Sequence, residues 1–275
     1  MSTALTLAVV NQKGGVGKTT TSVNLAAALA QSGRRVLLVD LDPQGNATMG
    51  SGIDKRVAPR TVYHVLLGLC DLSAARTRSE QGGYDLVPAN RELAGAEIEL
   101  VELTGRESRL KLALERALGE YDFVLIDCPP SLSLLTVNAL TAAQRVLIPM
   151  QCEYYALEGV SDLFNTLAQI RRAMNPTLKV EGLLLTMYDE RTNLSPAVAA
   201  DLRAFYGSLV FQTVIPRNVR LAEAPSHGRP ILSYDSRSRG AEAYTQLAQE
   251  VLAHDQETAG ARTERPAVDS FVASG

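Results

Sequence analysis

The feature that most constrains this chain is a glycine-rich loop between a strand-like run and a helix-like run near its beginning. The stretch reads LTLAVVNQKGGVGKTTTSVNLAAALAQSG, residues 5–33. An apolar run over 5–10 leads into three closely spaced glycines, and an alanine-rich helical pattern begins at Lys18. Strand, glycine-rich turn and helix in this order form the setting of a phosphate-binding loop, where backbone N–H groups and a helix N-terminus face an anion. The stretch therefore predicts an α/β fold built around a phosphate site.

The loop departs from the standard pattern G-x-x-x-x-G-K-[ST], which requires a glycine where this chain has Gln12. Lys18 is placed to reach the β- and γ-phosphates of a nucleotide, and the Thr19 hydroxyl is placed to bind Mg²⁺. A second lysine, Lys13, opens the loop and is poorly placed for the same task. With Gly14 beside it to allow close approach, we expect Lys13 to reach a nucleotide in another subunit, as arginine fingers do.

Three aspartates stand where predicted strands end. Asp40 and Asp42 follow VLLV, and Asp127 closes FVLI. Ligands of open α/β sheets bind at the carboxyl ends of the strands. We expect Asp127 to hold Mg²⁺, through a water molecule, in the manner of a Walker B aspartate. The three carboxylates and the loop together predict a site for a magnesium–nucleotide complex.

The rest of the chain alternates strand-like and helix-like runs. Near-continuous Val, Leu and Ile runs, typical of parallel strands covered on both faces, occupy 5–10, 35–40, 121–127, 145–150, 179–186 and 209–215. Helical patterns occupy 18–32, ending at Gly33, and 91–103, 106–119, 132–143, 156–174 and 196–206. The alternation predicts a doubly wound, mostly parallel sheet flanked by helices, the fold of P-loop NTPases. We expect one domain over 1–254 and a disordered tail over 255–275.

Charge is distributed unevenly along the chain. The formal net charge is −3, yet residues 171–239 contain ten Lys or Arg against six Asp or Glu. Any contact with nucleic acid must come from such a local excess. Few aromatic residues interleave with these charges, so we expect phosphate contact, which is salt-dependent and indifferent to sequence, rather than base stacking. The arginines expected to share one basic face are Arg171, Arg172, Arg217, Arg220, Arg229, Arg237 and Arg239.

The cysteines and the hydropathy pattern exclude several protein classes. Cys70, Cys128 and Cys152 are widely spaced and odd in number, so neither a disulfide framework nor a zinc site is indicated, and we expect buried apolar roles. The sequence shows neither a signal-peptide pattern nor an apolar run long enough to span a membrane. We therefore expect a cytoplasmic protein.

At this point several motifs resemble one family. KGGVGKTT, residues 13–20, resembles the deviant Walker A motif of the MinD/ParA class. Together with VLLVDLDPQGNAT, IDCPPSL, PMQCEYYALEG, TMYDERTN and IPRNVRLAEAPSHGRPI, it is similar to the ParA/Soj chromosome-partitioning ATPases. The resemblance covers about residues 4–254.

The resemblance implies an ATP hydrolase that is weak alone, uses Mg²⁺ and forms an ATP-dependent sandwich dimer. It implies that Lys13, with Gly14 at the dimer interface, contacts the partner's ATP, that Asp42 orients the attacking water, and that Asp40 supports the magnesium shell. The implied nucleotide contacts are Lys13, Gly14, Gly15, Val16, Gly17, Lys18, Thr19, Thr20, and Pro216 and Asn218 at the adenine. Thr19, Asp40 and Asp127 are the implied metal-site residues.

The resemblance also implies partners. The family binds double-stranded DNA without sequence preference as an ATP-bound dimer, and a ParB-type centromere-binding protein stimulates hydrolysis and releases the dimer. Arg191 and Arg220 match the family's DNA contacts, and the local basic excess adds Arg217. The expected role is segregation of a chromosome or plasmid by a cytoplasmic, nucleoid-associated protein of a bacterium, without a membrane partner.

Three other functions share this loop. A MinD-like membrane-associated positioning ATPase requires a C-terminal amphipathic helix, and the tail has Val268, Phe271 and Val272 without helical period. An iron–sulfur reductase of the nitrogenase iron-protein type requires two cluster cysteines per subunit, and Cys128 and Cys152 lack that context. A metabolic ATP-dependent ligase requires a small-molecule pocket.

Overall fold

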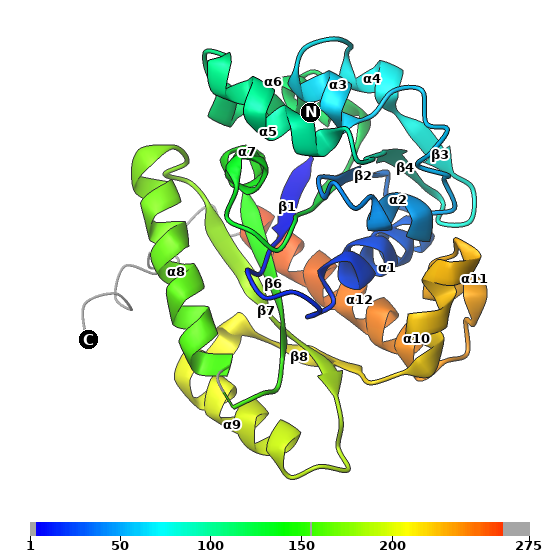
Figure 1. The fold of residues 1–275 in the computed structure, drawn as a ribbon. Helices are drawn as coiled ribbons and strands as arrows, with labels where there is room; N and C mark the ends of the chain where they lie inside the picture. Colours follow the sequence, from blue (N-terminus) through cyan, green and yellow to red (C-terminus); the bar gives the residue numbers. More distant parts are fainter. Residues whose placement is uncertain (1–3, 155, 261–275) are drawn as a thin grey trace.

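A single eight-stranded sheet organises the computed structural model, which describes residues 4–154 and 156–260 (Figure 1). The strands are β1 (Leu5–Val9), β2 (Val36–Asp40), β3 (Thr77–Ser79), β4 (Tyr84–Val87), β5 (Phe123–Asp127), β6 (Arg145–Gln151), β7 (Lys179–Tyr188) and β8 (Val210–Pro216). Their order across the sheet is β3-β4-β2-β5-β1-β6-β7-β8. Every neighbouring pair is parallel except β3 with β4. The predicted mostly parallel sheet is confirmed.

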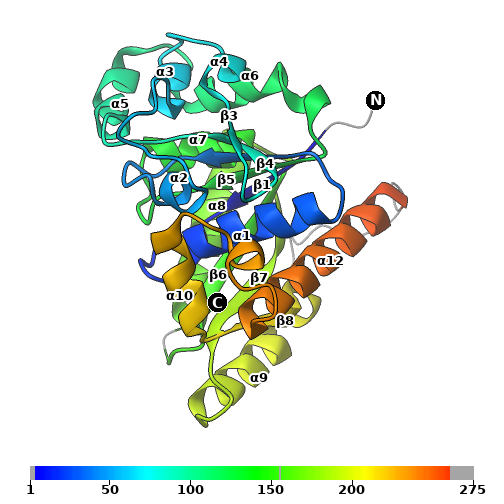
Figure 2. The ribbon, with the colours of Figure 1, turned by 90° about the vertical axis from the view of Figure 1, so that its right-hand side faces the viewer.

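Helices cover both faces of this sheet, as Figures 1 and 2 show. The α-helices are α1 (Lys18–Gln31), α2 (Asn46–Gly50), α3 (Val62–Leu66), α4 (Leu72–Ala75), α5 (Leu93–Glu99), α6 (Arg109–Glu115), α7 (Leu134–Ala142), α8 (Ala156–Ala173), α9 (Leu194–Tyr206), α10 (Val219–Glu223), α11 (Ile231–Tyr234) and α12 (Arg239–Gly260). Short 3-10 turns are η1 (Leu100–Glu102), η2 (Arg106–Ser108), η3 (Leu118–Glu120), η4 (Gly207–Leu209) and η5 (Ala224–His227).

Two apolar layers hold the helices to the sheet. One layer joins α1, α10, α11 and α12 to one face through side chains such as Leu29 and Leu247, both fully buried. The other joins α3 and α5 through α9 to the opposite face through side chains such as Leu140 and Leu202. Strands that are apolar on both faces fit this arrangement, because each face meets a layer of helices.

The strand order reverses at β1, which lies between β5 and β6. From β1 the chain crosses through α1 to β2, which lies beyond β5. The strands β6, β7 and β8 extend the sheet from β1 in the other direction. Such a switch point leaves a crevice at the carboxyl ends of the strands, where ligands of α/β sheets bind. The glycine-rich loop leaves β1 at this point.

Several elements differ from the prediction. The strands β3 and β4 are not predicted, because three- and four-residue strands carry too short a pattern. The helix α12 is also missing from the prediction, although Tyr244, Leu247, Ala248 and Val251 recur at helical spacing and are all buried. Because α12 continues through Gly260, the expected loss of structure at residue 255 is wrong for 255–260. Residues 261–275 of the expected tail lie outside the described residues, and the division into domain and tail stays a prediction.

Candidate nucleotide site and adjoining pocket

The loop between β1 and α1 has the backbone of a phosphate cradle. Gly15 and Gly17 have φ angles of +75° and +88°, in the left-handed region that favours glycine. Gly14 has no positive φ and is exposed. The loop ends at α1, whose first N–H groups have no partner inside the helix. The geometry therefore offers several backbone donors to one anion, and glycine is required at two of its positions.

Lys18 lies almost buried at the first position of α1, with 7% of its surface exposed. Its Nζ donates a hydrogen bond of 2.9 Å to the backbone oxygen of Lys13, across the loop. Burial lowers the pKa of the Lys18 ammonium, although the carboxylate of Asp127 attracts its charge. An ammonium group held here by a backbone oxygen can exchange that contact for a phosphate oxygen within the same loop.

Asp127 fixes the start of α1 to the end of β5. Thr19 Oγ1 donates to Asp127 Oδ2 and Ser22 Oγ donates to Asp127 Oδ1, both at 2.8 Å. Burial, with a smaller contribution from the neighbouring carboxylate of Asp40, raises the pKa of Asp127 to about 8. Ser22 is not among the site residues predicted from the sequence, although it lies three residues after Thr19 and therefore on the same face of the helix.

Asp40 lies beside Asp127, because the two residues are paired in register on β2 and β5. Its Oδ2 accepts hydrogen bonds from Thr48 N at 2.8 Å and Thr48 Oγ1 at 2.7 Å. Burial raises the pKa of Asp40 to about 6, against the hydrogen bonds of Thr48, which favour the charged form. The side chain of Asp42 is oriented by a separate hydrogen bond, in which its Oδ1 accepts from Gln44 N at 2.8 Å.

This group of side chains fits a divalent cation. Two fully buried carboxylates, Asp40 and Asp127, lie on neighbouring strands with raised pKa values, and a cation beside them would favour their charged forms. Thr19 adds a hydroxyl oxygen, a ligand that Mg²⁺ accepts. Within the described ranges, no group of three or more His, Cys, Asp or Glu side chains is arranged to hold a metal ion by itself.

Lys13 lies outside this cradle. Its backbone N–H donates to Asn11 Oδ1 at 2.9 Å, and Asn11 Nδ2 donates to Pro149 O at 2.8 Å, which fixes the start of the loop to β6. The Lys13 side chain is 57% exposed and forms an ion pair with Glu153, just beyond β6. The two lysines of the loop therefore differ in place: Lys18 faces inward across the loop and Lys13 lies on the surface.

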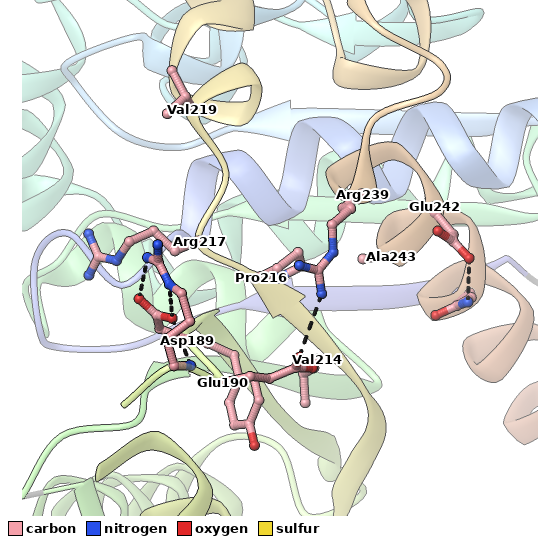
Figure 3. Close-up of a pocket in the computed structure, with 12 residues that line it drawn as sticks. Asp189, Glu190, Val214, Pro216, Arg217, Val219, Arg239, Glu242 and Ala243 are labelled. Carbon is pink, nitrogen blue, oxygen red and sulfur yellow. Dashed lines mark hydrogen bonds and ion pairs between the residues drawn. The ribbon is translucent and has the colours of Figure 1, made fainter. Parts of the chain in front are cut away.

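A pocket of about 610 Å³ adjoins this site at the carboxyl ends of β7 and β8 and the start of α12 (Figure 3). Pro216, Arg191 and Arg217 line it, so a residue expected at the adenine and two expected at DNA share one hollow. Asn218, also expected at the adenine, follows Pro216 and caps α10, since its Oδ1 accepts from Arg220 N at 2.8 Å.

The arginines of this region differ in their partners. Arg191 is held by Asp189 through two bonds, Nε to Oδ1 at 2.9 Å and Nη2 to Oδ2 at 2.8 Å. Arg220 pairs with Glu223 at 3.0 Å, and it does not line the pocket. The exposed guanidinium of Arg217 has neither a hydrogen bond nor an ion pair with any residue that the structure describes.

The seven arginines that were expected from the sequence to share one basic face do not all lie on the same side of the molecule. Arg171 and Arg172 end α8, which runs antiparallel to the strands, and Arg171 Nε bonds the backbone oxygen of Leu178 just before β7. They therefore lie near the amino end of β7, whereas Arg217 follows the carboxyl end of β8; the end of α8 and the end of β8 can be followed in Figure 1. Arg239, at the start of α12, does join the pocket, where it lies 3.9 Å from a carboxylate oxygen of Glu190.

The cysteines are free, as expected. Cys128 and Cys152 are buried within the apolar layer around α7 and α8, and Cys70 is half-buried. No helix in the described part of the chain is both long and apolar enough to cross a membrane.

This chain is similar to one family model and to several named proteins. A family model described as an AAA domain matches residues 4–180. The sporulation initiation inhibitor protein Soj of Bacillus subtilis is 56% identical over 248 residues, covering 90% of this chain and 98% of that protein. The chromosome partitioning protein ParA of Caulobacter vibrioides is 51% identical over 253 residues, covering 91% and 95%.

A solved structure from Mycobacterium smegmatis, described as cobyrinic acid a,c-diamide synthase with bound ATP analog and magnesium, superposes with a TM-score of 0.82. It is 44% identical and covers 93% of this chain and 97% of that chain.

Proposed function

The chain belongs to the ParA/Soj family of chromosome-partitioning ATPases, and from that premise we propose that it couples ATP binding and hydrolysis to reversible DNA binding. The DNA is bound without regard to sequence, and the process serves segregation of a chromosome or plasmid. The observation that carries the proposal is the division of labour in the loop. Lys18 faces inward across the loop, near Asp127, whereas Lys13 is exposed at the surface.

ATP is bound by the loop and the start of α1. Backbone N–H groups from Gly14 to Thr20 surround the phosphates, and Lys18 leaves the Lys13 oxygen to contact them. Thr19 and Asp127 hold Mg²⁺, with Asp40 supporting that shell, and the ion neutralises charge on the β- and γ-phosphates. The adenine lies against Pro216 and Asn218.

Two ATP-bound subunits form a sandwich dimer. Lys13 leaves Glu153 and reaches the phosphates bound by the other subunit, where a cation stabilises charge that develops during phosphoryl transfer. Gly14 lies at the contact between the subunits and allows the close approach. An exposed ion pair such as Lys13–Glu153 is worth about 0–1 kcal/mol, so its loss opposes dimerisation only weakly.

DNA binding follows from pairing two basic surfaces. Each subunit contributes Arg191, Arg217 and Arg220, which contact phosphates and leave the bases unread. The second half-site binds at high effective concentration once the first is engaged, so the dimer binds far more tightly than the monomer. Because the dimer requires ATP, DNA binding becomes dependent on ATP.

Hydrolysis resets the cycle. Asp42 orients the attacking water, and the reaction is slow until a ParB-type centromere-binding protein engages the dimer. Loss of the γ-phosphate releases the subunits from each other and from DNA. The protein acts in the cytoplasm on the nucleoid, without a membrane partner.

The proposal is tested by fluorescence anisotropy of a labelled random-sequence duplex, titrated with the protein under ATP, ADP or no nucleotide. Binding is expected with ATP alone. Six phosphate contacts per dimer imply a fall in affinity of roughly 10³-fold between 50 and 200 mM salt. Binding that is equal under all three conditions, or absent under all, would contradict the proposal.

One observation favours a second function. The Mycobacterium smegmatis structure, at 44% identity, carries the name of a cobyrinic acid a,c-diamide synthase and holds an ATP analog, so an ATP-dependent ligase acting on a carboxylic acid is the second candidate. A ligase would turn over ATP only when its acid substrate is present, and its rate would not respond to DNA. ATP turnover measured with duplex DNA and with cobyrinic acid plus an amide donor separates the two functions.

A further inference from the structure

Two side chains hold the outer side of the phosphate loop. Thr186 Oγ1 lies 2.8 Å from the backbone oxygen of Val16 and 3.1 Å from that of Met150 on β6, and its one proton is donated to the nearer oxygen, that of Val16. Gln151 Nε2 donates to the backbone oxygen of Gly15 at 2.9 Å. Thr186 and Gln151 are direct neighbours, because they are paired in register at the carboxyl ends of β7 and β6. Neither residue belongs to the motif of the loop itself.

These two bonds set the direction of the loop's N–H groups. In a trans peptide the C=O and the following N–H lie in one plane and point in opposite directions. Holding the Gly15 and Val16 oxygens toward β6 and β7 therefore turns the N–H groups of Val16 and Gly17 the other way, toward the interior of the loop. That interior is where a phosphate group is bound.

The residue after Thr186 has a strained backbone. Met187 is half-buried, and it is the one non-glycine residue with a positive φ, +51°, within 4–154 and 156–260. Its Sδ lies 2.9 Å from Gln151 Nε2, the same nitrogen that bonds the loop. Such a conformation is unfavourable for a residue with a side chain and persists where the surroundings impose it, often at functional sites.

The left-handed backbone at Met187 has a geometric consequence. Thr186 points to the phosphate loop, whereas Tyr188, two residues later, lines the pocket at the ends of β7 and β8, and its backbone oxygen accepts a hydrogen bond from Arg217 N at 3.0 Å. Tyr188 also pairs with Pro216 on β8. The left-handed backbone at Met187 lies between these two residues, so the end of β7 contacts the phosphate loop through Thr186 and lines the pocket through Tyr188.

We propose that Thr186 and Gln151 are positioning residues of the phosphate loop, acting through the carbonyl oxygens of Val16 and Gly15. The left-handed turn at Met187 keeps both of them in register with the loop. This inference rests on the proposed nucleotide site, and it adds two residues that the loop motif does not contain. Their removal leaves every phosphate-facing group in place and loosens only its orientation.

The test compares Thr186→Val, which keeps the shape and removes the hydroxyl, with Thr186→Ser, which keeps the hydroxyl. Gln151→Ala removes the second bond independently. Affinities for fluorescent ATP and ADP analogues with Mg²⁺ are measured by titration, and thermal unfolding is followed for each variant. Each lost bond is expected to weaken both nucleotides about fivefold, the size of one hydrogen bond, with Thr186→Ser within about twofold of the parent.

The readouts separate positioning from mere packing. A packing role would lower the melting temperature and leave the nucleotide affinity of the folded protein unchanged, whereas a positioning role weakens the affinity for both nucleotides even where the melting temperature is preserved. If Thr186→Val does not fold, Gln151→Ala alone decides, and parental affinity there overturns the inference. Parental affinity in both folded variants overturns it too. Absence of nucleotide binding by the parent protein would instead overturn the proposed function, and this inference with it.

Discussion

Substituting Gly14 by valine tests the expected dimer interface without disturbing the subunit. A Cβ built at Gly14 meets nothing within 4 Å, the residue is exposed, and its φ is not positive. The subunit can therefore accept valine, and we expect the free energy of unfolding to change by no more than about 0.5 kcal/mol. ATP affinity should likewise stay unchanged, because the loop keeps its two left-handed glycines.

The effect on dimerisation should be far larger. If Gly14 lies where two subunits approach closely, three added carbons overpack the contact, and overpacking costs about 1–3 kcal/mol. A symmetric dimer contains the loop twice, so the cost is incurred twice. We expect ATP-dependent dimerisation to weaken at least about thirtyfold.

Light scattering under ATP measures this, with both proteins also carrying Asp42→Ala so that hydrolysis does not deplete the dimer. Gly119→Val is the matched control, because Gly119 is also exposed, has no positive φ and has open space around its Cβ, but lies in η3. A Gly14→Val protein that dimerises like the control would refute the interface role. Loss of ATP binding or folding would refute the inference that the subunit tolerates the change.

Two further predictions concern charges. Replacing Glu153 by glutamine frees Lys13 from its ion pair and should lower the protein concentration needed for ATP-dependent dimerisation about two- to fourfold; Asp162→Asn, which removes one charge from α8, should not. A decrease in dimerisation would show that Glu153 supports the dimer instead. His254 Nδ1 donates a hydrogen bond to Glu181 Oε1 at 3.0 Å, which raises the pKa of His254, so this pair stabilises the fold below pH about 6.5 and its contribution is lost as pH rises through the folded-state pKa. In urea unfolding, His254→Gln should therefore cost more stability at pH 6 than at pH 8, and an equal cost at both would count against the pair.

The centre of the site was predictable because its residues are contiguous in sequence. Gly15, Gly17 and Lys18 belong to one motif, and the strand-end position of Asp127 follows from the pattern of the preceding apolar run. Parallel strands align their carboxyl ends at one edge of the sheet, so sequence pattern also brought Asp40 toward the loop.

The supports of the site were not predictable in the same way. Thr186 and Gln151 reach the loop across 170 and 136 residues of chain, and only the register of β6 and β7 brings them together. Polar residues at strand ends are common, so nothing in their local sequence marks them. The left-handed backbone of Met187 likewise has no sequence signal, because methionine rarely adopts it.

Charge counting predicted the basic character of the second half and misplaced its geometry. The excess between residues 171 and 239 is real, but the chain places Arg171 at the amino end of β7 and Arg217 beyond the carboxyl end of β8. The ion pairs of these arginines were not predicted from the sequence either, since Asp189 bonds Arg191 only because a local turn brings the two residues together. The net charge of a segment therefore counts its basic residues, whereas the direction of the strands decides which of those residues lie on the same surface.

In the proposed cycle, Lys18 serves the nucleotide of its own subunit and Lys13 serves that of its partner. Mixing two inactive variants, Lys13→Gln and Asp42→Ala, and measuring ATP turnover with saturating DNA tests this division directly. In a mixed dimer, the Lys13→Gln subunit keeps its own Asp42 and receives Lys13 from the other, so one of the two sites is complete. The account predicts that activity appears on mixing and approaches about one quarter of the parent rate at equal concentrations, for random pairing. Turnover that stays at the sum of the two separate variants would contradict it.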